Sequence, residues 1–146
     1  MQTIGQSEYS FDRIATEAAY AKVDRSGAEA CVCDACRNYV AVRARLLPEC
    51  FVSFLKSVGV DPNKEAEAYH MGRVAAGKHF YGGWYHFVGE LHKTGDFPPI
   101  AAGDEFSFFL CRANAPHLRA LDGHKLVEVE FEARAVPWVI DLPEPR

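Results

Sequence analysis

The chain has 146 residues, 49% of them hydrophobic and 25% charged, which is the composition of an ordinary globular protein that can bury a core as a single domain over residues 1–146. No apolar run approaches the roughly 18 residues that a membrane helix needs, so the sequence excludes a membrane span. The net charge of −4 gives no general attraction to phosphate, and we therefore expect a protein partner rather than a nucleic acid.

The N-terminal residues and the cysteine count bear on the cellular compartment. Residues 1–9 carry neither a basic start nor an apolar stretch, so they lack the pattern of a signal peptide. The five cysteines are an odd number and cannot all pair within one chain. These features predict a cytoplasmic protein whose thiols are reduced or bind a metal.

The first half of the chain has helical patterning, with apolar residues three and four apart, and Asp, Ser, Pro and Gly at positions that start or stop helices. In chain order we expect a helix capped by Ser10 and ending near Lys22, an extended segment over residues 28–33, a helix capped by Asp34 and ending at Leu47, and a helix from Pro48 that ends before Gly59.

The second half has strand composition, with alternating apolar and polar residues between turn signals. The expected strands are residues 67–74 and 79–91, joined as a hairpin at 75–78 and bulged or bent at Gly82 and Gly83, then 106–112, 127–135 and a short edge strand at 138–140. The sequence thus predicts an α+β fold in which a helical N-terminal half, of about three helices, packs on a mainly antiparallel sheet formed by the C-terminal half.

Three cysteines within six residues are the most pointed chemical feature of the sequence. Cys31 and Cys33 are two apart in the extended segment and so face the same way, and Cys36 follows in the first turn of the next helix. Thiolates at this spacing supply three of the four ligands that a structural zinc site needs. His86, from the sheet, or Cys50, after the corner at Pro48, is the expected fourth ligand.

Two other interpretations of the cysteines stay open. A thiol enzyme or redox protein would use Cys33 and Cys36 with His86 as base, although Asp34 between the thiols opposes thiolate formation. Alternatively, the cysteines are buried, inert residues of a partner-binding domain without metal. Because no catalytic motif accompanies the thiols, a zinc-stabilised binding or regulatory module is expected rather than an enzyme.

The remaining polar candidates have plainer interpretations. Glu128, Glu130 and Glu132 alternate with apolar residues, which is typical of the solvated side of a sheet. Taken alone, Cys50 and Cys111 are expected in the core. The histidines other than His86 are expected on the surface or in loops. Arg37, Arg43 and Arg45 are expected on a solvated helix face.

One stretch of the chain also resembles a known family. The string from Cys31 through Cys33 and Cys36 to Arg37-Asn38-Tyr39, then Pro48, Val58-Gly59-Val60-Asp61-Pro62 and Gly83-Trp84-Tyr85-His86-Phe87-Val88-Gly89, is similar to a family of small bacterial proteins without an assigned activity. The resemblance spans about residues 10–91. It implies a bacterial source and carries no mechanism over to this chain.

Overall fold

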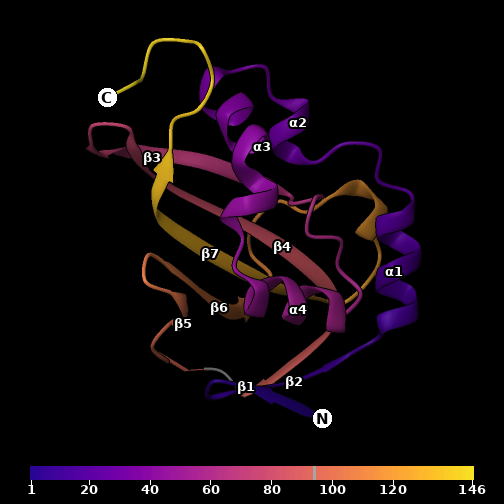
Figure 1. Cartoon of the computed structure of the whole chain (residues 1–146). Helices are drawn as coiled ribbons and strands as arrows, with labels where there is room; N and C mark the ends of the chain where they lie inside the picture. Colours follow the sequence, from indigo (N-terminus) through magenta and orange to yellow (C-terminus); the bar gives the residue numbers. More distant parts are fainter. Residues whose placement is uncertain (94) are drawn as a thin grey trace.

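The computed structural model describes residues 1–93 and 95–146, and an antiparallel sheet organises them. Figure 1 shows α3 and α4 lying over one face of the sheet, with α1 beside it. The helices are α1 (Arg13–Ala21), α2 (Gly27–Ala30), α3 (Asp34–Leu46) and α4 (Glu49–Ser57), with a single 3-10 turn, η1 (Arg119–Leu121). The strands are β1 (Gln2–Ile4), β2 (Ser7–Phe11), β3 (Glu67–Ala75), β4 (Lys78–Lys93), β5 (Ile100–Gly103), β6 (Phe106–Arg112) and β7 (Leu126–Pro137).

The two longest strands form the middle of the sheet. The order is β1-β2-β4-β7-β6-β5, and β3 pairs with the first part of β4 while β2 pairs with its last part. Since β7 pairs with both β4 and β6, it joins the two halves of the sheet. Among the described residues no helix combines the length and apolar character needed to cross a membrane.

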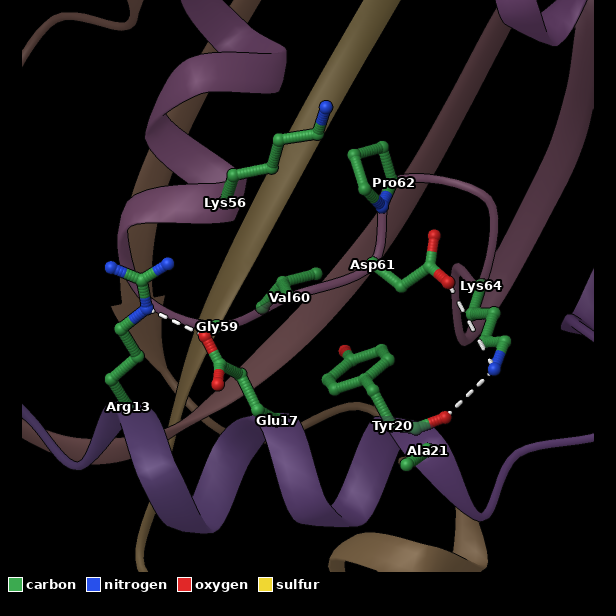
Figure 2. Close-up of a pocket in the computed structure, with 10 residues that line it drawn as sticks. All are labelled: Arg13, Glu17, Tyr20, Ala21, Lys56, Gly59, Val60, Asp61, Pro62 and Lys64. Carbon is green, nitrogen blue, oxygen red and sulfur yellow. Dashed lines mark hydrogen bonds and ion pairs between the residues drawn. The ribbon is translucent and has the colours of Figure 1, made fainter.

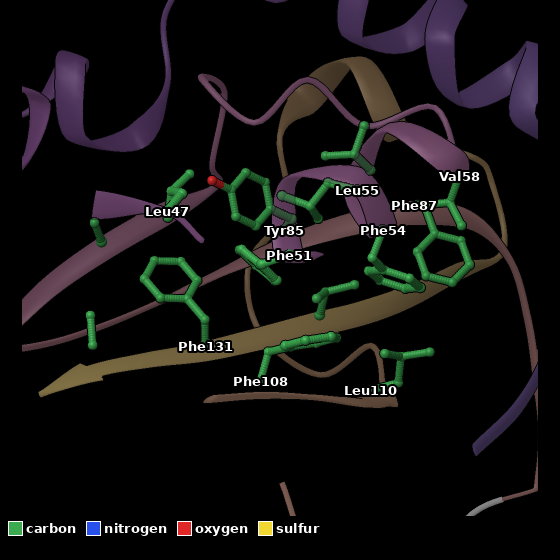
Figure 3. Packing of buried hydrophobic residues seen from close by; sticks show 14 of the residues in the cluster. Leu47, Phe51, Phe54, Leu55, Val58, Tyr85, Phe87, Phe108, Leu110 and Phe131 are labelled. Atoms are coloured by element: carbon green, nitrogen blue, oxygen red, sulfur yellow. The ribbon is translucent and has the colours of Figure 1, made fainter. Parts of the chain in front are cut away.

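The core lies between α4 and the inner face of the sheet, as Figure 3 shows. Phe51 of α4 is fully buried, with its ring centroid 4.9 Å from that of Phe108 and 5.8 Å from that of Phe131. Tyr85 and Phe87 reach the same core from β4. Side chains alternate along a strand, so the residues between these, such as His86, point to the opposite, outer face.

The predicted α+β class is confirmed, but the sheet is not built from the C-terminal half alone. Residues 2–11 form a hairpin, β1 and β2, that was not expected, and Gly5 turns between them with φ +57°. Ser10, the expected helix cap, is paired with Glu90 in the sheet. Asp12 caps α1 instead, because its carboxylate accepts a 2.9 Å hydrogen bond from the Ala15 amide.

The expected extended segment at residues 28–33 is wrong over its first half. Ser26 and Glu29 form a capping box, each side chain accepting from the other residue's amide, and this nucleates the short helix α2. Cys31 follows as the C-cap, and Cys33, not Asp34, is the N-cap of α3. The cysteines therefore lie in the link between two helices.

Two further sheet predictions need correction, and one strand was not predicted. Gly82 and Gly83 keep a continuous register, and a Cβ on them would collide with Tyr69 and Phe131, so these glycines permit close packing rather than a bulge. Residues 138–140 are not a strand, and the short strand β5 was not expected.

Arg43 is buried, although a solvated position was expected for it. Its guanidinium donates to Glu65 Oε1 at 2.9 Å and to Ser26 Oγ at 3.2 Å. Glu65 is fully buried, and its ion pair with Arg43 joins α3 to the segment before β3. The Arg43 guanidinium is therefore not available to bind a phosphate group.

Candidate metal centre

Cys31, Cys33 and Cys36, named here the helix cluster, come together where α2 ends and α3 begins. Their sulfur atoms all lie within 4.8 Å of one another, and the Sγ atoms of Cys31 and Cys33 are 3.3 Å apart. Cys33 is exposed, Cys31 partly so, and Cys36 is buried. Three thiols at these distances suit one metal ion that takes sulfur ligands.

The first turn of α3 and the edge of the sheet hold the helix cluster. The Cys36 amide donates to Cys33 Sγ at 3.5 Å, and the Cys36 thiol donates to the Ala68 carbonyl of β3 at 3.8 Å. A hydrogen bond from the Cys33 backbone lowers the pKa of the Cys31 thiol, whereas burial raises that of Cys36. In the metal-free cluster the Cys31 thiol therefore ionises more easily than the Cys36 thiol.

Neither expected fourth ligand belongs to the helix cluster in the structure. His86 points to the outer face, so the sheet separates its ring from α3, and its Nε2 lies 3.0 Å from Glu128 Oε1. Cys50 lies in α4, beyond the C-terminal end of α3, whereas Cys36 lies in the first turn of α3, and about 15 Å of helix rise separates Cys36 from Leu46, the last residue of α3. The Cys50 thiol donates instead to the Ala102 carbonyl at 3.5 Å.

The structure also gathers a second set of metal-ligating atoms on the outer face of the sheet. The ligand atoms of Cys111, Glu128 and Glu130, named here the sheet cluster, lie within 4.8 Å of one another. Glu128 is fully buried, which corrects the solvated position expected for it, because the loop before η1 covers this part of the outer face. Cys111 is half-buried beside the two carboxylates rather than within the apolar core.

A row of two histidines and one carboxylate lies near the hairpin of β3 and β4, where surface histidines were expected. His79 is fully buried, with Nδ1 2.7 Å from His70 Nε2 and Nε2 2.7 Å from Glu144 Oε1. Glu144 also accepts from the Gly77 amide at 2.7 Å. Burial, and then His79, lowers the pKa of His70.

Figure 2 shows a separate pocket of about 490 Å³ between α1 and the segment after α4. Its charged groups are largely paired: Arg13 with Glu17 at 2.6 Å, and Lys64 with the Tyr20 carbonyl at 2.8 Å and Asp61 at 3.9 Å. No cysteine or histidine lines it. The thiol chemistry of this chain therefore lies outside the pocket.

Comparison of the chain with models of known protein families, with curated proteins and with solved structures gives no match. The family resemblance of residues 10–91 therefore stays a prediction.

Proposed function

We propose that this protein is a small binding or regulatory module in which Cys31, Cys33 and Cys36 bind zinc. The observation that carries the proposal is the approach of the three sulfur atoms to within 4.8 Å, across the junction of two helices. Cys36 also contacts β3, so an ion held there ties the helical layer to the sheet. In small metal-binding domains the energy of metal binding adds to the energy of folding.

The fourth position of this zinc site faces the solvent side of the cluster, because Cys33 is exposed and no fourth His, Cys, Asp or Glu of the described residues joins the group. A solvent molecule or a ligand from a partner would complete tetrahedral coordination there. We propose a protein partner rather than a nucleic acid, since the net charge is −4 and Arg43 is committed to Glu65.

Zinc content tests this function. Purified protein is equilibrated with zinc, desalted and analysed for metal per chain, for the wild type, Cys33→Ser and Cys50→Ser. Cys50 is the matched control because it is also exposed but lies outside the helix cluster. We expect Cys33→Ser to lose one equivalent of zinc and Cys50→Ser to lose none. Equal zinc content in all three proteins would overturn the zinc module.

A second function, a thiol redox pair, is favoured by one distance. The Sγ atoms of Cys31 and Cys33 are 3.3 Å apart and accessible, whereas Cys36 is buried, so the pair differs from the Cys33 and Cys36 pair expected from the sequence. Oxidation by glutathione disulfide would form a bond between the two sulfur atoms and break the S–S bond of glutathione disulfide, and the two protons and two electrons would pass to its sulfur atoms to give two glutathione molecules. Peptide mapping of zinc-free protein after this treatment identifies the pair, and two unlinked thiols would rule it out.

A further inference from the structure

The sheet cluster contains one carboxylate whose orientation the fold fixes. Glu128 Oε1 accepts three hydrogen bonds: from the Asn114 amide at 3.2 Å, the Ala115 amide at 2.9 Å and His86 Nε2 at 3.0 Å. The other oxygen, Oε2, faces Cys111 Sγ at 3.4 Å. A carboxylate held this way at one oxygen presents the other as a ready ligand, as the supported ligands of metal sites do.

Cys111, Glu128 and Glu130 face one another, and no positively charged side chain of the described residues pairs with the two carboxylates. Cys111 Sγ lies 3.4 Å from Glu128 Oε2 and 3.3 Å from Glu130 Oε2, but a thiol has one proton and cannot donate fully to both oxygens. Among the described residues no lysine or arginine pairs with Glu128 or Glu130, and Arg134 pairs with Glu132 instead, at 3.2 Å. A divalent cation in place of the thiol proton would bind the Cys111 sulfur and one oxygen of each carboxylate at the same time.

His86 lies against the same carboxylate and leaves one buried nitrogen without a partner. Its side chain is fully buried and its Nε2–H donates to the Glu128 carboxylate, so Nδ1 carries a lone pair, and this nitrogen has no hydrogen-bond partner. Unpaired polar atoms are rare in protein interiors because they cost free energy. The hydrogen bond from Nε2 orients Glu128, as the hydrogen-bond partners of metal-ligating carboxylates do, whereas Nδ1 is directed away from Glu128.

We infer that Cys111, Glu128 and Glu130 form a second metal site, for a divalent transition cation of the zinc class. A thiolate with two carboxylate oxygens favours Zn²⁺, Co²⁺ or Fe²⁺ over Mg²⁺ and Ca²⁺, which prefer oxygen ligands alone. Cys111 and Glu130 are only half-buried, so the ion reaches the site from their side, while Glu128 and His86 form its closed side. The sheet separates this site from the helix cluster, so either can exist without the other.

Cobalt titration separates the two sites. Cys31→Ser with Cys33→Ser removes the two accessible thiols of the helix cluster and serves as the background, in which Co²⁺ is titrated and its thiolate absorption band followed. Glu130→Gln is compared with Glu132→Gln on this background, because Glu132 is the next outward carboxylate of β7 and lies outside the cluster. We expect one Co²⁺ per chain with a thiolate band in the background and in Glu132→Gln, and at least about tenfold weaker binding in Glu130→Gln.

Two results would overturn the second site: no cobalt–thiolate band in the background protein, or equal cobalt affinity in Glu130→Gln and Glu132→Gln. If circular dichroism shows that Glu130→Gln is unfolded, Cys111→Ser replaces it with the same expected loss. Because the background lacks two ligands of the helix cluster, its result does not depend on whether the zinc module of the first proposal is correct.

Discussion

The helix cluster offers three sulfur atoms and the sheet cluster one sulfur atom with two carboxylate oxygens, and the two sets are held in different ways. Cys31, Cys33 and Cys36 are close in sequence, and two of them are accessible to solvent. The members of the sheet cluster come from two strands paired by register, Cys111 opposite Glu128, with Glu128 fully buried and fixed by three donors. A metal would organise the first cluster, whereas the fold has already organised the second.

The largest expected difference concerns stability without metal. Glu128→Ala leaves two amides and the His86 N–H without an acceptor in a buried place, so the free energy of unfolding should fall by about 3 kcal/mol. Glu132→Ala removes only a partly exposed pair with Arg134 and should cost less than about 1 kcal/mol. Urea unfolding in the presence of a chelator measures both. Equal losses would show that the sheet cluster is no better organised than an ordinary surface carboxylate.

Thiol reactivity gives the next largest contrast. In chelator, Cys31 and Cys33 should be alkylated at least about tenfold faster than Cys111, because Cys33 is exposed and a hydrogen bond from the Cys33 backbone lowers the pKa of Cys31. Burial, then the hydrogen bond with Glu130, raises the pKa of Cys111. Mass spectrometry of peptides after timed alkylation gives each rate. Cys50, exposed and outside both clusters, is the internal reference, and a Cys111 rate matching that of Cys50 would contradict the expected protection.

The third prediction concerns the loss of stability at acid pH that is due to His70, a residue outside both clusters. Since the folded pKa of His70 is lowered, mainly by burial and then by His79, the unfolded chain binds a proton more readily. The stability associated with neutral His70 is therefore complete above the unfolded pKa of about 6.5 and is lost as the pH falls through the lower folded pKa.

Urea midpoints at pH 7.5 and 5.5, in chelator, should consequently fall less in His70→Gln than in the wild type. The dependence that remains in the variant includes His86, whose pKa burial also lowers. An identical pH dependence in both proteins would contradict the role of His70. Once this contribution is known, acid release of metal from either cluster can be measured separately.

The smallest expected effect lies beside the helix cluster. Asp34 and Arg37 are exposed and 4.0 Å apart, so Asp34→Asn should change the free energy of unfolding by no more than about 0.5 kcal/mol. Thermal unfolding of the metal-free variant and wild type is the measurement. A larger change would mean that the charges of Asp34 and Arg37 contribute to the stability of the metal-free helix cluster.

The helix cluster was predictable because its geometry is local. Residues 31–36 need only one helix start to bring their thiols together, and a steep excess of cysteines marks them in the sequence. Likewise Phe51, Phe54 and Leu55 predicted both α4 and its buried face, which the structure confirms.

The sheet cluster was not predictable, because it depends on register and on what covers a face. Alternation placed Glu128 opposite the apolar side, as the structure has it, but gives no sign that the loop with Asn114 and Ala115 folds over it. Nor does any pattern show that Cys111 stands opposite Glu128. The register of β6 and β7 would have been the missing signal, and it arises only when the whole sheet packs.

The position of β7 between β4 and β6 sets an order of events during synthesis on the ribosome. Residues 31–36 emerge early, and their thiols can meet a metal ion while most of the sheet is still unmade. Cys111 has no carboxylate of the sheet cluster beside it until residues 126–137 have been synthesised and β7 has paired with β6. The two clusters would thus acquire their ions at different times, one from a growing chain and the other only from a nearly finished one.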